Sequence, residues 1–277
     1  MIFGPRIELK TPAELQVMHR AGQLTRQVLA AARSAAVPGA TTAEVAAAAE
    51  HVIVAAGARS NFKGYQGFPA VVCISVNEEI VHGIPGPRTL EAGDLVSIDG
   101  GAIVEGFHGD SALTMIVGGD DAGSAADREL SAATEQAMWA GIAAFAIGTR
   151  VSDIGDAIDD FVTERFPHLG LVEEFTGHGI GTAMHMAPEV LNYRARSNGP
   201  KIKAGMCLAI EPMLTRGGGE TVTLDDDWTA VTADGSRASH WEHSVARHVD
   251  GVWVLTAEDG GAAGLSPFGI TPVPPAG

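Results

Sequence analysis

The sequence predicts an α+β protein made of two similar halves. Two helix-like segments are followed by strand-like segments, and this order occurs twice along the 277 residues. A shift of 109 residues also brings helix caps and core positions of the two halves into register. It carries Gly39, Glu44, Val45 and Ile53 onto Gly148, Asp153, Ile154 and Val162. We therefore expect one composite domain over residues 1–258, with repeats at about 10–122 and 123–255, rather than two separable domains.

Capping signals define the first pair of helices. Residues 11–14 (TPAE) place Glu three positions after Thr and proline at the first helical position, which is typical of a capping box. This helix is predicted to run to about Ala36. Residues 41–44 (TTAE) open a second helix that ends near Gly57, where glycine suits a left-handed cap. The second pair of helices is predicted at about Asp127–Ile147 and Ser152–Phe166.

Strands are predicted for the rest of each half, from about Ala70 to Gly118 and again up to Val254. A turn at residues 104–106 folds DLVSIDGGAIV back on EGFHGDSALTMIV, which places Asp99 and Asp110 roughly opposite each other. Residues 215–237 are predicted to form a Gly- and Asp-rich hairpin or loop. Residues 259–277 have the Gly, Pro and Ser content of a mobile tail.

Charge and composition narrow the classes of function. Against 34 Asp and Glu there are 18 Lys and Arg, and the formal charge of −16 argues against nucleic acid or an anionic membrane surface as a partner. The sequence contains no apolar stretch long enough to span a bilayer and no secretory signal, so we place the protein in the cytoplasm. Cys73 and Cys207 each lie in an apolar run and are expected to be buried thiols rather than a disulfide.

Five side chains between Asp99 and Glu242 have the chemistry of a two-metal site. Two carboxylates about 5 Å apart on paired strands repel each other and need a cation. His178 in GHGIG, Glu211 in AIEPM and Glu242 in HWEHS lie in apolar or Gly-rich surroundings, where an unpaired charge is costly. With Asp99 and Asp110 they make a mostly oxygen ligand set that suits two divalent ions of Co, Mn, Fe or Zn, a known hydrolytic arrangement. The pattern predicts a metallohydrolase without selecting among these metals.

Seven segments, in the expected order, resemble type I methionine aminopeptidases. They are VCISVNEEIVHGIP, SIDGG, GFHGDSA, GHGIG, MHMAPEVLNY, IEPML and WEHSV, and the resemblance covers roughly residues 10–255. It implies the pita-bread (creatinase/aminopeptidase) fold, in which two pseudo-symmetric αβ halves flank a curved antiparallel sheet that cradles a dinuclear metal centre. This implied fold agrees with the internal repeat.

The resemblance also implies a role for each ligand. Asp110 and Glu242 are similar to bridging ligands, and Asp99 is similar to the bidentate ligand of one metal. His178 and Glu211 are similar to ligands of the other metal. Glu211 is further implied to move a proton while a metal-bound hydroxide attacks the scissile carbonyl.

Two other histidines are implied to contact the substrate. His185 would donate a hydrogen bond to the scissile carbonyl or to the developing oxyanion, and His82 would hold the amide nitrogen of the next residue. The free amine of the substrate is expected to reach a metal or a nearby carboxylate, which restricts cleavage to the terminal residue. His108, His240 and His243 neighbour the ligands without matching a ligand position, and we expect them to be structural or to support the ligands.

A methionine pocket is implied at six apolar, aromatic or thiol positions that would grip a thioether. These are Phe62, Tyr65, Phe68, Cys73, Met184 and Trp228. Phe62 stands where the family commonly has a small or thiol residue, Met184 where it has an aromatic, and Gln66 where it often has histidine. These changes bear on the shape of the pocket.

The resemblance implies removal of the initiator methionine from nascent proteins whose second residue is small, because a narrow site excludes bulk. The substrates are then peptides that begin with Met, contact with the ribosome is transient, and a monomer is expected.

Two alternative functions stay open. A prolidase or Xaa-Pro aminopeptidase resembles this chain in fold and ligands, but usually has a further N-terminal domain, for which the residues before Thr11 leave no room. A non-catalytic pita-bread binding protein would have lost ligands, whereas all five are present here.

Overall fold

The computed structural model describes residues 6–275, and two pairs of helices recur within it. The first pair is α1 (Pro12–Ala35) and α2 (Thr42–Ala55), and the second is α3 (Ala125–Ile147) and α4 (Ser152–Arg165). The pairs have 24 and 14 residues and 23 and 14 residues, so the helix lengths repeat together with the order. Both predicted capping boxes form, and Gly57 has a left-handed φ of +63° just beyond α2.

The core positions matched by the internal repeat are buried in both halves. Val45 and Ile53 on α2, like Ile154 and Val162 on α4, pack in hydrophobic clusters. The caps also correspond: Glu44 accepts a hydrogen bond from the amide of Thr41, and Asp153 accepts one from the amide of Arg150. The two helix pairs therefore share their caps and core positions.

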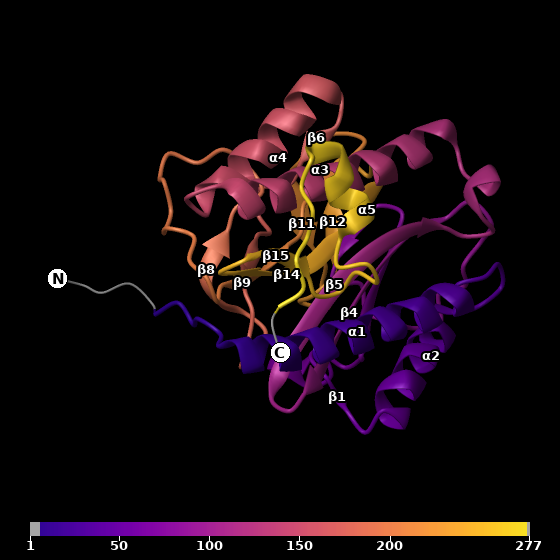
Figure 1. The fold of residues 1–277 in the computed structure, drawn as a ribbon. Helices are drawn as coiled ribbons and strands as arrows, with labels where there is room; N and C mark the ends of the chain where they lie inside the picture. The colour runs from indigo at the N-terminus through magenta and orange to yellow at the C-terminus, as the bar shows by residue number, and fades with distance from the viewer. Residues whose placement is uncertain (1–5, 276–277) are drawn as a thin grey trace.

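An antiparallel sheet of nine strands lies against these helices (Figure 1). Strand β14 (Glu242–His248) joins the halves, because it pairs with β5 (Phe107–Ile116) on one side and β9 (Cys207–Ile210) on the other. Outside the main path, β2 (Val72–Val76) pairs with β4 (Leu95–Val104), and β15 (Gly251–Val254) pairs with β14. In spatial order the main path is β1 (Arg59–Ser60), β4 (Leu95–Val104), β5 (Phe107–Ile116), β14 (Glu242–His248), β9 (Cys207–Ile210), β7 (Gly177–Gly179) and β8 (Met186–Val190), with β2 (Val72–Val76) and β15 (Gly251–Val254) beside it.

Two small sheets and short helical turns complete the described chain. One sheet is made of β13 (Ala238–His240), β10 (Met213–Thr215) and β6 (Gly170–Leu171), and the other of β11 (Thr221–Thr223), β12 (Ala230–Thr232) and β3 (Glu79–Val81). The β11–β12 hairpin lies in the segment 215–237, where a hairpin or loop was predicted. The short helices are η1 (Tyr65–Gly67), η2 (Asp120–Ala122), α5 (Ala262–Leu265) and η3 (Ser266–Phe268).

Strands β4 and β5 divide their side chains between two faces. Ile98 and Leu113 pack in the hydrophobic cluster formed with α1 and α2. Because successive strand residues point to opposite faces, Asp99 and Ala112 face away from these helices. Asp110, two residues from Ala112, shares that face. The helices thus cover the back of the sheet, and the predicted ligands lie on its front.

Residues 259–275 do not form the mobile tail that their composition suggested. Leu265 on α5 is fully buried in the cluster built around α3. The amide of Val273 donates to the carbonyl of Val252 at 2.9 Å, and the Gln16 side chain donates to the Pro275 carbonyl at 2.6 Å. A Cβ atom on Gly264 would lie 2.2 Å from the Trp139 ring, so this glycine permits close packing. The remainder of the predicted tail, 276–277, lies outside the described residues.

Both cysteines are free and buried, as predicted. Over residues 6–275, no helix has the length and apolarity needed to cross a membrane.

Candidate metal centre

The two aspartates of the β4–β5 hairpin are diagonal neighbours rather than directly opposed. Asp99 pairs with Ala112, and Asp110 pairs with Gly101. The register follows from the two-residue turn, in which Glu105 and Gly106 have φ values of +50° and +85°. Such a turn with both central residues at positive φ matches the twist of paired strands. Asp99 and Asp110 still share the front face of the sheet.

The small side chain of Ala112 separates two carboxylates in a row across three strands. Asp99 pairs with Ala112 from β4, and Glu242 pairs with Ala112 from β14. Because side chains of directly paired residues lie side by side, a larger residue at 112 would occupy the space between these carboxylates. Alanine leaves this space open on the face that also carries Asp110.

The second half contributes an imidazole and another carboxylate. His178 on β7 pairs with Ala209, and Glu211 follows the last residue of β9. Nδ1 of His178 lies 3.0 Å from the carbonyl oxygen of Gly179, which can only accept, so Nδ1 donates and Nε2 keeps its lone pair. Nε2 lies 3.4 Å from Oε1 of Glu211. This tautomer is the one in which Nε2 can bind a metal.

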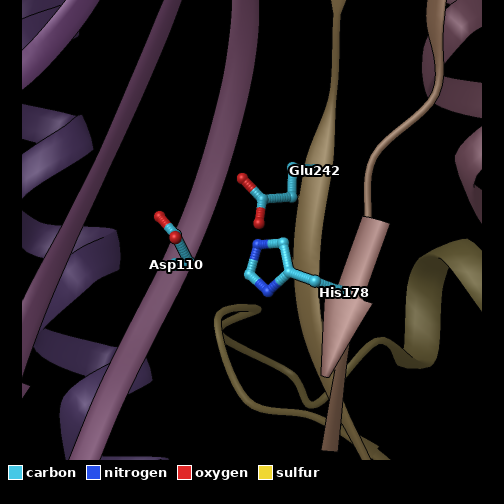
Figure 2. Close-up of side chains that lie close together, drawn as sticks. All are labelled: Asp110, His178 and Glu242. Carbon is cyan, nitrogen blue, oxygen red and sulfur yellow. The ribbon is translucent and has the colours of Figure 1, made fainter. Parts of the chain in front are cut away.

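Side chains from three strands converge at the centre. Ligand atoms of Asp110, His178 and Glu242 all lie within 4.8 Å of one another. Figure 2 shows the carboxylates of Asp110 and Glu242 and the imidazole of His178 pointing into the same space. Such spacing allows a single ion to contact atoms from β5, β7 and β14.

Burial destabilises the charged forms of the four carboxylates, and their mutual repulsion adds to this effect. Burial raises the pKa of Asp110 to about 7, and it raises the pKa values of Asp99, Glu211 and Glu242, with neighbouring carboxylates adding to the effect. Burial lowers the pKa of His178 to about 3, so its imidazole is neutral. One oxygen of each of the four carboxylates is buried without a hydrogen-bond partner in the described chain. Divalent cations fit this donor set, because they supply charge to the orphaned oxygens.

Every predicted site residue lines one cavity. The apolar wall is a cluster of Phe62, Phe68, Cys73 and Met184, with Tyr65 and Trp228 packed against it. The five predicted ligands line the same cavity, as do His82 and His185. The structure therefore brings the predicted pocket and the predicted metal ligands together.

The two predicted substrate-contacting histidines are neutral and held in defined positions. His82 has a left-handed φ of +61°, and its ring meets the Phe175 ring edge-on at 5.4 Å. Burial, with a smaller effect of His185, lowers the pKa of His82 to about 4. His185 Nδ1 lies 2.8 Å from the Tyr65 hydroxyl, and burial lowers the pKa of His185.

The cavity is also lined by residues that were not assigned to it from the sequence, which include Val81, Phe175, Thr176, Met213 and His240. Phe175 lines the wall beside His82. His240, which we expected only to support the ligands, lines the cavity itself, and its Nε2 lies 3.8 Å from Oε2 of Glu211. His240 could have been assigned to the cavity from the sequence, because it lies two residues before Glu242. Phe175 could not, because an aromatic residue before TGHGIG is equally suited to the core.

The other two flanking histidines lie outside the cavity lining. The His108 amide donates to the Gly181 carbonyl at 2.9 Å. Nδ1 of His243 lies 2.8 Å from the Thr256 hydroxyl, and its ring packs 5.2 Å from the Trp139 ring. The His243 contacts fit the structural or supporting role expected of it, whereas the buried Nδ1 of His108 has no hydrogen-bond partner in residues 6–275.

Comparisons with known proteins identify relatives over most of the chain. The model of "Metallopeptidase family M24" matches residues 16–246. Methionine aminopeptidase 1 of Mycobacterium tuberculosis is 47% identical over 252 residues, which cover 89% of this chain and 94% of that protein.

Solved structures show the same architecture. Methionine aminopeptidase from Thermotoga maritima superposes with a TM-score of 0.86 at 35% identity, covering 91% of this chain and all of that one. Prolidase from Pyrococcus furiosus reaches a TM-score of 0.71 at 22% identity, covering 90% of this chain and 65% of that one, and shows a shared fold alone. The predicted pita-bread fold, with its curved antiparallel sheet, is thereby confirmed. This chain is a hydrolase of metallopeptidase family M24 and belongs to its methionine aminopeptidase branch.

Proposed function

We propose that this protein removes the N-terminal methionine from peptides and nascent proteins whose second residue is small. The observation that carries the proposal is the meeting of four buried carboxylates and one imidazole with an apolar cavity in a single site. Family membership implies divalent metal, and we propose two ions, of Co, Mn, Fe or Zn. Their proposed ligands are Asp99, Asp110, His178, Glu211 and Glu242.

When bound, paired divalent ions polarise a carbonyl and lower the pKa of water to near 7. One oxygen of each carboxylate is shielded from solvent, so charge interactions with it are strong. We assign proton transfer to Glu211, whose buried Oε1 has no hydrogen-bond donor in the described chain.

The hydrogen bond between Tyr65 and His185 supports a role for His185 at the scissile carbonyl. If the Tyr65 hydroxyl donates to Nδ1, the imidazole proton lies on Nε2. His185 can then donate from Nε2 to a carbonyl that gains negative charge. We assign His82 to the amide nitrogen that follows the scissile bond, because its ring is wedged between Phe175 and Trp228 on the same cavity.

Methionine is the side chain we assign to the apolar wall. Phe68 meets Phe62 and Trp228 edge-on, with ring centroids 6.3 and 5.0 Å away. A thioether makes favourable contacts with ring edges, and the flexible Met184 side chain can adapt to it. Restriction to a small second residue is carried from the family. We also propose a cytoplasmic monomer whose contact with the ribosome is transient.

The test is methionine release from Met-Ala-Ser, Met-Leu-Ser and an Xaa-Pro peptide, after chelation and after return of Mn, Fe, Co or Zn. We expect chelation to abolish cleavage, and metal to restore it for Met-Ala-Ser far more than for Met-Leu-Ser. Preference for the Xaa-Pro peptide would assign the protein to the prolidase activity instead. A metal-loaded protein that cleaves none of the three would indicate a binding protein.

A further inference from the structure

A short segment before the first helix lies across the loop that carries His185. We call residues 7–10 the N-terminal strap and residues 181–185 the His185 loop. Glu8 of the strap accepts two hydrogen bonds from Thr182 of the loop. Its Oε2 lies 2.5 Å from the Thr182 hydroxyl, and its Oε1 lies 3.2 Å from the Thr182 amide. A single carboxylate therefore holds both the side chain and the backbone of Thr182.

Lys10 fixes the strap from the other side. Its side chain is only 2% exposed, and Nζ lies 3.2 Å from Oε1 of Glu8. The Lys10 amide donates to the Gly205 carbonyl at 2.8 Å, just before β9. Lysine is rarely buried unless it is paired, so this ammonium favours one orientation of the Glu8 carboxylate. The strap is thus tied both to the sheet and to the His185 loop.

The side chains of the strap pack closely against Gly181, the first residue of the loop. A Cβ atom on Gly181 would lie 2.1 Å from Oε1 of Glu8 and 2.4 Å from Cε of Lys10. On the opposite side, the carbonyl of Gly181 accepts from the His108 amide of β5 at 2.9 Å. The start of the His185 loop is therefore clamped between the strap and the strand that carries Asp110.

The end of the loop reaches the cavity. Met184 is buried in the apolar wall, whereas His185 is more exposed and has the Tyr65 hydroxyl as its hydrogen-bond partner. The His185 ring packs against the His178 and Tyr65 rings, with centroids 4.3 and 5.2 Å away, and its position also depends on the backbone that carries it. That backbone begins three residues earlier, at Thr182.

We propose that the N-terminal strap is a positioning element, which acts through Thr182 to place His185 at the scissile bond. Glu8 is a positioning residue and does not itself contact the substrate. The inference rests on the proposed role of His185 and adds a requirement for Glu8 and Lys10 that lies outside the cavity. Misplacement of a catalytic group by 1 Å can cost about 100-fold in rate, so a loosened loop is expected to be costly.

The first experiment compares Glu8→Ala, Glu8→Gln and Glu14→Ala in the metal-loaded full-length protein. We expect Glu8→Ala to lower kcat for Met-Ala-Ser about tenfold with little change in KM. Glu8→Gln keeps an oxygen acceptor for Thr182 and should recover most of the rate. Glu14→Ala removes the capping carboxylate of α1, which touches Thr11 and not the loop, and should leave kcat unchanged. Thermal midpoints separate lost stability from lost rate.

The second experiment places Glu8→Ala in a His185→Ala background and measures amide exchange at Thr182. If the strap acts through His185, Glu8→Ala has no further effect on kcat in that background. Exchange at the Thr182 amide should quicken in Glu8→Ala and not in Glu14→Ala. Full additivity of the two losses, or an unchanged kcat in Glu8→Ala alone, would overturn the inference while the role of His185 stands. A His185→Ala protein with the parent rate would instead refute the role of His185 and the strap inference together.

Discussion

Two groups of buried carboxylates in this protein are stabilised in opposite ways. At the metal centre, burial raises the pKa of Asp110 to about 7, and one of its oxygens has no hydrogen-bond partner in residues 6–275. At the start of α3, Asp127 is equally buried. Burial alone would raise the pKa of Asp127, but hydrogen bonds from Ser124 and the charges of Arg237 and Arg216 lower it overall.

The difference lies in which molecule supplies the compensating charge. Oδ2 of Asp127 lies 2.6 Å from the Ser124 hydroxyl and 3.0 Å from Nη1 of Arg237, and Oδ1 lies 3.2 Å from Nη1 of Arg216. The chain itself compensates this carboxylate. At the proposed metal site an external cation would compensate the Asp110 group, so that burial there serves binding rather than folding.

The largest effect is expected from neutralising the metal centre with Asp110→Asn. Even residues that only support metal ligands cost about 10- to 100-fold when changed, so loss of a ligand should lower methionine release by at least about 100-fold. Metal content and turnover of Met-Ala-Ser measure the effect. The chelated variant should be no less stable than the chelated parent, since it has lost a buried charge. A variant with full activity and full metal content would remove Asp110 from the ligand set.

The pH dependence of the metal-free protein gives a smaller effect with a definite sign. The folded pKa of Asp110, about 7, lies above its ordinary 3.8, so between these values the folded state holds a proton that the unfolded chain has lost. This group therefore lowers the free energy of unfolding as pH rises from about 4 to 7, by a few kcal/mol. Buried neutral histidines act in the opposite direction, because burial lowers their pKa values.

The measurement is therefore the difference in the free energy of unfolding between the chelated Asp110→Asn variant and the chelated parent. Urea unfolding at several pH values gives this difference. We expect the advantage of the variant to grow from pH 4 to pH 7. A constant difference across this range would show that Asp110 titrates normally.

The smallest effect is expected at the carboxylate that the chain compensates by itself. Asp127→Asn should cost about 2 kcal/mol of stability at pH 7, less than a fully buried pair, because Arg216 and Arg237 are 40% and 30% exposed. With the pKa of Asp127 lowered, its contribution is complete above pH 4 and is lost as pH falls through the folded pKa. Methionine release should be unchanged. A large loss of turnover at equal stability would show that the two sites are coupled.

Local signals explain why much of the helical layer could be predicted from the sequence. Each capping box places its signal within four residues, so the starts of α1 and α2 needed no knowledge of tertiary structure. The residues proposed as ligands stand out in the sequence for a different reason. Each is a charged or imidazole group in an apolar setting, where a residue without a partner is too costly to keep.

Register and packing explain what could not be predicted. The diagonal arrangement of Asp99 and Asp110 depends on the number of residues in one turn, which shifts every pair in the hairpin. In the segment after β15, the glycines that suggest mobility instead admit the Trp139 and Trp253 rings. The contact of Gly264 with Trp139 joins residues more than a hundred positions apart, and composition does not record it.

Strand β14 has a consequence for the synthesis of the chain. Glu242 begins this strand and meets Ala112 from a half of the sheet made 130 residues earlier. A ribosome therefore exposes Asp99 and Asp110 long before it exposes the last carboxylate, and the intervening loop must close before the cluster exists. A chain that has not reached Glu242 cannot assemble the cluster, so any aminopeptidase activity begins only after translation has passed this residue.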